Sequence, residues 1–221
     1  MSTHTRGIII PMYNPEPFAE TQADAMLAVI RAHPLGVLVT SGPEGPEASH
    51  LPFFLDASAR LLRCHMARAN PQWRLLQPGD RALVIFAGPD HYITPSWYPG
   101  KREHGKVVPT WNYVAVHVTG NVRLFEDAPS LLQHLNELTD FNEARFARPW
   151  SVADAPPEYI AGMAKAIVGI EVAMDRIEGK WKVSQNRSEA DQQGVVEGLR
   201  ELGSDAGREM ANLIGVAHRP R

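Results

Sequence analysis

The segment from His65 to Trp73 has the residues of an anion site, at the point where a predicted strand ends and a short helix is expected. Asn70 is a favoured helix N-cap and Pro71 a favoured first helical residue. The first turn of such a helix offers free backbone N–H groups, and Arg68 adds a permanent cation whose planar head suits a phosphate. A capped turn with a solvated arginine explains the same residues, so both interpretations stay open.

Two further segments combine aromatic rings with hydroxyl groups. The first is Tyr92-Ile93-Thr94-Pro95-Ser96-Trp97-Tyr98-Pro99, and the second is Val108-Pro109-Thr110-Trp111-Asn112-Tyr113. Aromatic faces and hydroxyls can line a pocket for a planar ring. The first segment reads equally well as a hydrophobic loop that covers the end of a barrel. Residues 100–106, between the two, are basic and favour a solvated loop over a lid, a dimer contact or a nucleic-acid contact.

A fourth segment, Lys180–Arg187, pairs cations with the amide side chains of Gln185 and Asn186. Amides can hydrogen-bond the edge of a heterocycle as donors and as acceptors. The alternative is a strand end followed by a helix cap, because Ser188 and Asp191 have capping-box spacing.

The elements that must position these segments are mostly short strands. One helix is expected first, because Ala23, Met26, Leu27 and Ile30 share a helical face and Pro34 ends the pattern. Strands are then expected at 35–40, 48–55, 60–65, 81–87 and 92–96. Such close spacing favours antiparallel pairing, since parallel strands need long crossovers.

Two longer strands are expected at 113–125 and 166–177, where apolar residues alternate with others. Gly120 interrupts the first apolar face and indicates a bend at a barrel corner. Helices are expected near 128–140 and after Ser188, and a frayed tail, with one helical turn at most, after Gly203. Six or seven strands with peripheral helices indicate a mainly β fold, an antiparallel barrel, in one domain over 1–202 with a tail at 203–221.

Composition and missing motifs exclude several function classes. The formal net charge of −3 argues against direct nucleic-acid binding, and no stretch is apolar enough for a membrane span. The single cysteine, Cys64, is expected to be a buried inert thiol, and cytoplasmic residence is the natural expectation. Phosphate-cradling glycine loops and a nucleophile elbow are absent from the sequence. His134 and Glu137 are expected to make a surface contact on a helix rather than a metal site.

Taken together, the segments resemble the PaiB-type family of FMN-binding negative transcriptional regulators. The motifs that carry this resemblance run in family order across about 12–202: Met12-Tyr13, Ser49-His50-Leu51-Pro52-Phe53, His65-Met66-Ala67-Arg68-Ala69-Asn70-Pro71, Tyr92-Ile93-Thr94-Pro95-Ser96-Trp97-Tyr98, Val108-Pro109-Thr110-Trp111-Asn112-Tyr113 and Lys182-Val183-Ser184-Gln185-Asn186. One small departure is Val183, where a larger aliphatic residue is common.

The resemblance implies an antiparallel FMN-binding split barrel, related to pyridoxamine-phosphate oxidase, that binds FMN between the subunits of a homodimer. By position, Ala67, Arg68 and Asn70 resemble the phosphate loop, and the strand His50-Leu51-Pro52 resembles the one that edges the flavin ring. Further candidates for cofactor binding, from motif position and chemistry, are Ser96, Trp97, Thr110, Trp111, Gln185 and Asn186.

Two functions follow from these expectations. One is a flavin-dependent redox protein or sensor, in which the protein orients the flavin and the flavin supplies the electron chemistry. The other is a DNA-binding repressor whose flavin is structural or regulatory. The sequence shows no evident general base, so no catalytic residue is assigned.

Overall fold

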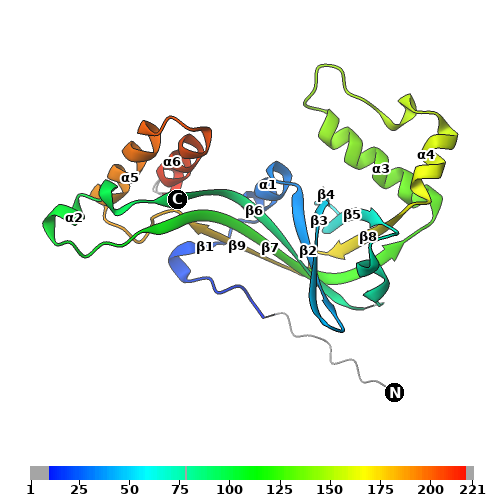
Figure 1. The fold of residues 1–221 in the computed structure, drawn as a ribbon, viewed down its shortest axis with the longest axis horizontal. Helices are drawn as coiled ribbons and strands as arrows, with labels where there is room; N and C mark the ends of the chain where they lie inside the picture. The colour runs from blue at the N-terminus through cyan, green and yellow to red at the C-terminus, as the bar shows by residue number, and fades with distance from the viewer. Residues whose placement is uncertain (1–9, 78, 218–221) are drawn as a thin grey trace. The chain divides into compact units, whose positions relative to one another are not determined.

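The computed structural model describes residues 10–77 and 79–217, and these residues form a mainly β fold with peripheral helices (Figure 1). The strands are β1 (Ala19–Glu20), β2 (Leu35–Gly42), β3 (Gly45–Pro52), β4 (Phe54–Asp56), β5 (Leu61–Ala67), β6 (Arg81–Ile93), β7 (Thr110–Phe125), β8 (Ile167–Ala173) and β9 (Arg176–Lys182). The α-helices are α1 (Ala23–Ala32), α2 (Gly100–Glu103), α3 (Ala128–Glu143), α4 (Pro157–Ala164), α5 (Glu189–Glu201) and α6 (Asp205–Ala217).

The contacts divide the chain into two compact units that interleave along the sequence. Of the described residues, 10–11, 27–86 and 117–177 form the first unit, and 12–26, 87–116 and 178–217 form the second. The long strands β6 and β7 therefore contribute residues to both units. The sequence-based expectation of one domain ending at residue 202 stays a prediction.

The sheet of the first unit is antiparallel and curls on itself. The strand order is β3-β2-β6-β7-β8-β5-β4, and β9 pairs separately with β1 and β7. Although β3 and β5 lie at or near opposite ends of this order, they approach each other. No ladder joins them among the described residues, so the barrel stays open at this seam, as in a split barrel. The predicted fold class is confirmed.

Alternation along the strands builds the core of this barrel. Val116, Val118 and Val122 on β7 are fully or nearly buried. On β5, every second residue is buried in the same way: Leu62, Cys64 and Met66. Phe53 and Phe86 meet edge to face at 5.5 Å between ring centroids. Burial raises the pKa of the Cys64 thiol, which agrees with the prediction of an inert cysteine.

Gly120 has a more specific role than the bend expected from the sequence. A Cβ at this position would lie 1.5 Å from the carbonyl oxygen of Ala173. The backbone of β8 therefore comes against β7 at a place where only glycine leaves room.

Several predicted elements have different bounds in the structure. The expected strand at 166–177 is two strands, because the chain turns after Ala173 and β9 begins at Arg176. The expected strand at 81–87 and the start of the one expected at 92–96 form one strand, β6, which ends at Ile93, and Pro95–Trp97 is a short 3-10 helix instead of a strand. Pro89 is compatible with that strand because β2 pairs only with residues 83–85, which leaves the later part of β6 without this neighbour.

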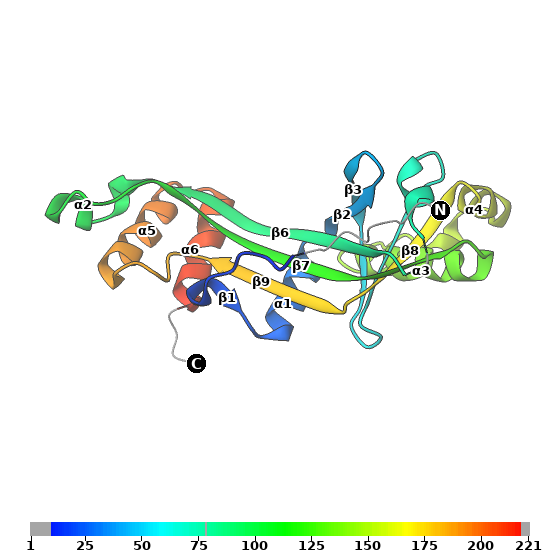
Figure 2. The same cartoon turned by 90° about the horizontal axis from the view of Figure 1, so that it is seen from below.

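The tail expected after Gly203 is instead the helix α6, which packs against α5 (Figure 1). Met210, Ala211 and Ile214 bury its apolar face, which explains why the segment is ordered. In the first unit, α3 and α4 also lie side by side (Figure 2). None of the helices in the described residues is long and apolar enough to cross a membrane.

Candidate functional site

The predicted N-cap at Asn70 is present and organises the turn that follows β5. The Asn70 side chain accepts a hydrogen bond from the Gln72 backbone N–H at 3.0 Å, at the start of a short 3-10 helix, Pro71–Leu75. Its amide nitrogen donates to Ser49 Oγ on β3, also at 3.0 Å. This bond ties the turn to β3, the strand that carries His50. The structure therefore brings the predicted phosphate turn and the predicted flavin-edge strand together.

Gln72 joins the turn to strands β2 and β3 through hydrogen bonds, a role that the sequence did not indicate. Its side chain is buried, accepts from Ser49 Oγ at 2.6 Å and donates to Thr40 Oγ1 at 2.9 Å. The same amide nitrogen also lies 3.2 Å from the Glu47 carbonyl oxygen. A buried amide satisfied on several sides fixes its surroundings, because each lost bond would leave a polar group unpaired.

The strand that resembles a flavin edge is open on one side. β3 pairs with β2 through residue pairs such as His50 with Val37, and it carries no second ladder among the described residues. His50 and Pro52 are exposed, whereas Leu51 is buried. An edge strand of this kind presents unpaired backbone groups that can bind the polar edge of a ring.

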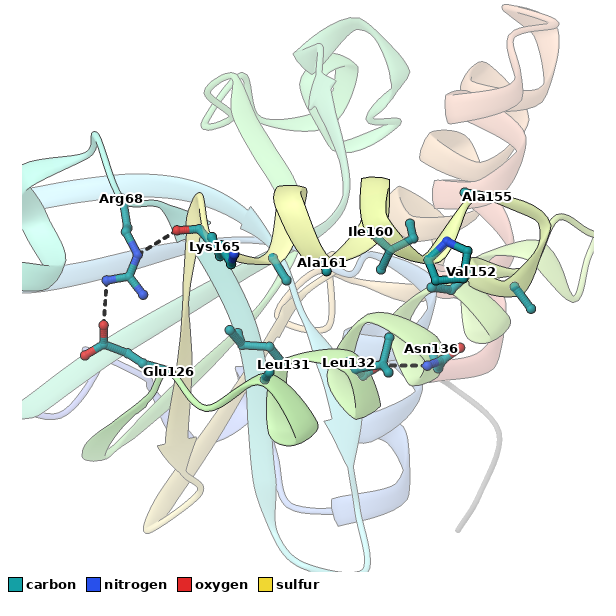
Figure 3. Close-up of a pocket in the computed structure, with 14 residues that line it drawn as sticks. Arg68, Glu126, Leu131, Leu132, Asn136, Val152, Ala155, Ile160, Ala161 and Lys165 are labelled. Atoms are coloured by element: carbon teal, nitrogen blue, oxygen red, sulfur yellow. Dashed lines mark hydrogen bonds and ion pairs between the residues drawn. The ribbon is translucent and has the colours of Figure 1, made fainter.

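Arg68 lies at this turn but is not a free cation. Its Nη1 is 2.5 Å from Glu126 Oε2, and its Nε donates to the Lys165 carbonyl oxygen at 2.9 Å (Figure 3). Nη2 has no hydrogen-bond partner among the described residues. Both side chains of the ion pair are substantially exposed, so the pair is weak and can exchange partners.

The other six candidates belong to the second unit, where Lys182 holds two of them, Thr110 and Trp111. Its ammonium donates to Thr110 Oγ1 at 2.6 Å and to the Trp111 carbonyl oxygen. Burial, then the nearby cations Arg187 and Lys180, lower the pKa of Lys182. A bound anion would relieve this repulsion between cations. The sequence offered a signal in the cation-rich segment 180–187, but not the choice of Lys182.

A buried pair holds the same two segments together. Asn112 Nδ2 donates to Ser184 Oγ at 2.9 Å, and both side chains are buried. Ser184 has a φ of 69°, in the left-handed region that is unusual for a residue other than glycine. The backbone strain at Ser184 is compensated by this contact, which sets where β9 ends relative to Thr110.

Gln185 and Asn186 differ in their availability. The Gln185 side chain accepts from the Val183 N–H at 2.7 Å and donates to the Trp181 carbonyl oxygen, so both ends stabilise its own turn. Asn186 is exposed. Of the two predicted amides, Asn186 therefore keeps its hydrogen-bonding groups toward solvent.

The aromatic candidates also divide by environment. Trp111 is 53% exposed and meets Tyr92 edge to face at 5.9 Å. Trp97 instead packs against α5, where a Cβ at Gly198 would lie 2.4 Å from its indole ring. Ser96 is exposed and accepts from the Lys101 ammonium at 3.2 Å. Trp111 is thus the candidate ring that is most open to a ligand.

These residues fit the chemical groups of FMN. In the first unit, the open edge of β3 suits an aromatic ring system and Arg68 is a cation that can bind an anion. In the second unit, the exposed Trp111 suits an aromatic ring and Lys182 is a further cation. Arg68 Nη2, which has no hydrogen-bond partner among the described residues, is the local observation that favours a phosphate.

Comparison with known proteins also supports an FMN-binding protein. Residues 12–176 match the family described as a putative FMN-binding domain. An uncharacterized protein of Emericella nidulans is 38% identical over 241 residues, covering 92% of this chain and 96% of that protein. The Bacillus subtilis protein named protease synthase and sporulation protein PAI 2 is 33% identical over 205 residues, with the same coverage of 92% and 96%.

Solved structures share the fold at low sequence identity. A flavocytochrome from Azotobacter vinelandii aligns with a TM-score of 0.54 at 14% identity, over 74% of this chain and 69% of that chain. A FAD and heme binding protein from Mycobacterium smegmatis aligns with a TM-score of 0.54 at 16% identity, over 74% and 73%. The resemblance seen in the motifs is confirmed, and so is FMN at the level of the family: the chain belongs to the putative FMN-binding domain family and is a PaiB-type flavoprotein.

Proposed function

We propose that this flavoprotein is a flavin-dependent redox protein or sensor, with FMN along the open edge of β3 and its phosphate at the turn after β5. The observation that carries this placement is the 3.0 Å hydrogen bond from Asn70 to Ser49, which fixes the turn against β3. His50, Leu51 and Pro52 would then edge the ring, and Ala67, Arg68 and Asn70 would hold the phosphate. FMN supplies the electron chemistry when it is bound.

The candidates of the second unit are proposed to bind the cofactor on grounds of their own chemistry. Thr110, held by Lys182, offers a fixed hydroxyl, and the exposed Trp111 offers a ring face. Ser96 and Asn186 are exposed polar groups, whereas Trp97 and Gln185 act by supporting the backbone around them. We assign these residues to cofactor binding or its support, and none to proton transfer.

The same proposal includes a homodimer. The open edge of β3 and the exposed side chains of Trp111 and Tyr92 are surfaces that a second subunit would cover. Tyr98, in the neighbouring aromatic segment, is 2% exposed and belongs to the core of its own subunit. The dimer contact therefore rests on Trp111 rather than Tyr98.

A role in transcription would be indirect. The formal charge of −3 gives no electrostatic drive toward DNA, and Lys101 on α2 is already hydrogen-bonded to Ser96. The regulator would respond to the flavin and act through a partner, in the cytoplasm. Nanomolar, competitor-resistant binding to DNA by the isolated protein would overturn this and favour the repressor hypothesis.

The test is the optical spectrum of purified protein, followed by mass identification of the released ligand and an anaerobic reductive titration. We expect FMN in stoichiometric amount, reduced reversibly without loss from the protein. Many cycles with a nicotinamide nucleotide and an acceptor would identify an enzyme, and a single reversible reduction would identify a sensor. A protein that binds no FMN after reconstitution, or that retains only FAD, would contradict the proposal.

A further inference from the structure

A large apolar pocket lies in the first unit, outside the strands of the barrel (Figure 3). Its volume is about 550 Å³, which is within the range of small-molecule sites. The walls come from α3, α4 and the 3-10 helix Val152–Asp154. None of the candidate flavin residues lines it except Arg68, at one end.

The pocket exists because its walls are made of small and branched side chains. Leu131, Leu132, Val152 and Ile160 form the apolar surface, and five alanines at positions 128, 153, 155, 161 and 164 leave the space between them open. Leu132 is 44% exposed, whereas Leu131 and Leu138 on the same helix are buried. An exposed, concave apolar surface of this kind costs solubility unless a ligand or partner covers it.

Polar groups are confined to the two ends of the pocket. Arg68, Glu126 and Lys165 lie together at one end, which therefore carries two positive charges and one negative charge (Figure 3). At the other end, Asn136 donates to the carbonyl oxygen of Leu132 on its own helix at 2.7 Å, so its amide is already engaged. The charged end thus favours an anion, and the remainder favours an apolar body.

We propose that this pocket binds a small amphipathic molecule with an apolar body and a single anionic group, of the medium-chain or aryl carboxylate class. The body lies between α3 and α4, and the anionic group lies beside Lys165, which leaves Arg68 to the proposed flavin phosphate. Lys165 makes no ion pair with the described residues, so it can supply charge without breaking an existing contact. The site is distinct from the flavin edge at β3 and would act as an effector or substrate pocket.

The first experiment fills the pocket in the FMN-loaded protein. Anilinonaphthalene sulfonate, whose fluorescence rises in apolar surroundings, is the probe, and decanoate is the competitor. Ala161→Phe places a ring in the space between α3 and α4, and Met163→Phe puts the same ring on an exposed position of α4 that does not line the pocket. We expect one probe site, displaced by decanoate, at least ten-fold weaker in Ala161→Phe and unchanged in Met163→Phe.

A second filling variant guards against a folding defect. Ala153→Phe approaches the pocket from the 3-10 helix, and circular dichroism with a thermal melt shows whether each variant folds. Probe binding that survives in folded Ala161→Phe and Ala153→Phe would overturn the proposal. So would a wild-type protein that binds no probe and becomes monomeric on Ala161→Phe, because a second copy would then cover the pocket.

The second experiment tests the anionic group. Decanoate should compete at least five-fold better than the neutral decanol, and Lys165→Gln should remove most of that difference without changing bound FMN. Equal competition by decanoate and decanol in the wild type would overturn the assignment of an anionic ligand. Loss of FMN from Lys165→Gln would show that this end belongs to the flavin site and would overturn the separation of the two sites.

Discussion

His65 Nδ1 lies 3.1 Å from His134 Nε2, and this contact joins strand β5 to helix α3 through a half-buried and a buried imidazole. His134 is 1% exposed, and burial, then His65 and Arg63, lower its pKa to about 3. Burial also lowers the pKa of His65. The sequence-based expectation of a surface contact at His134 and Glu137 is wrong for His134, because the helix turns that residue into the interior.

We predict that this pair makes the protein sensitive to acid. The pKa of His134 is lower in the folded chain than the ordinary value of 6.5, so the stabilisation is complete above pH 6.5 and is lost as pH falls toward 3. The free energy of unfolding should fall by about 1.4 kcal/mol per pH unit from this one proton. Denaturant titrations between pH 7 and 4.5 measure the slope.

The matched variants are His134→Leu and, as a control, His104→Gln at an exposed position. His134→Leu should lower stability at pH 7 and flatten the dependence on pH, whereas His104→Gln should leave the slope nearly unchanged. An unchanged slope in His134→Leu would place the proton uptake at other groups.

Gly120 provides a test of the sheet itself. Gly120→Ala should destabilise the protein by roughly 3 kcal/mol, because its Cβ would meet the backbone of Ala173 rather than a side chain that can move. The melting temperature should then fall by roughly 6–12 °C. Gly162→Ala is the control, since a Cβ in α4 meets nothing within 4 Å and alanine favours helix. Equal melting temperatures for the two variants would contradict the close approach of β7 and β8.

Local patterns predicted the elements that local chemistry determines. The alternation along β7 and the Asn70 and Ser188 caps are present as expected, because side-chain period and capping bonds involve neighbours in sequence. The break between β8 and β9 could not be predicted in this way. It is stabilised by distant contacts, such as the Arg60 carbonyl accepting from the Met174 N–H at 2.9 Å.

The sequence predicted which segments form the candidate site, but not which side chains in them make the long-range contacts. Gln72 and Lys182 act through contacts with residues about thirty and seventy positions away, which spacing along the chain does not show. Gln185 fitted the expected chemistry, yet its hydrogen bonds close its own turn. Arg68 was identified from its type and position, while its ion pair with Glu126 depends on the fold.

That ion pair yields a prediction for Glu126→Gln. Glu126 competes with a phosphate for Arg68, so removing its charge should strengthen FMN binding about three- to ten-fold. Riboflavin has no phosphate, and its affinity should stay the same. Fluorescence quenching titrations with both ligands measure the two dissociation constants. Weaker FMN binding in Glu126→Gln would show that the pair supports the site instead of competing with it.

The most direct measurement compares FMN and riboflavin binding in Arg68→Ala, with Arg74→Ala as the control, because Arg74 contacts the face of the same Trp73 ring. If Arg68 holds the phosphate, its loss removes charge-assisted hydrogen bonds worth ~1.5–3 kcal/mol, or about 10- to 150-fold in FMN affinity. Riboflavin affinity should barely change, and Arg74→Ala should bind both ligands as the wild type does. Equal losses for FMN and riboflavin, or a phosphate-specific loss found only in Lys182→Met, would contradict the placement of the phosphate at Arg68.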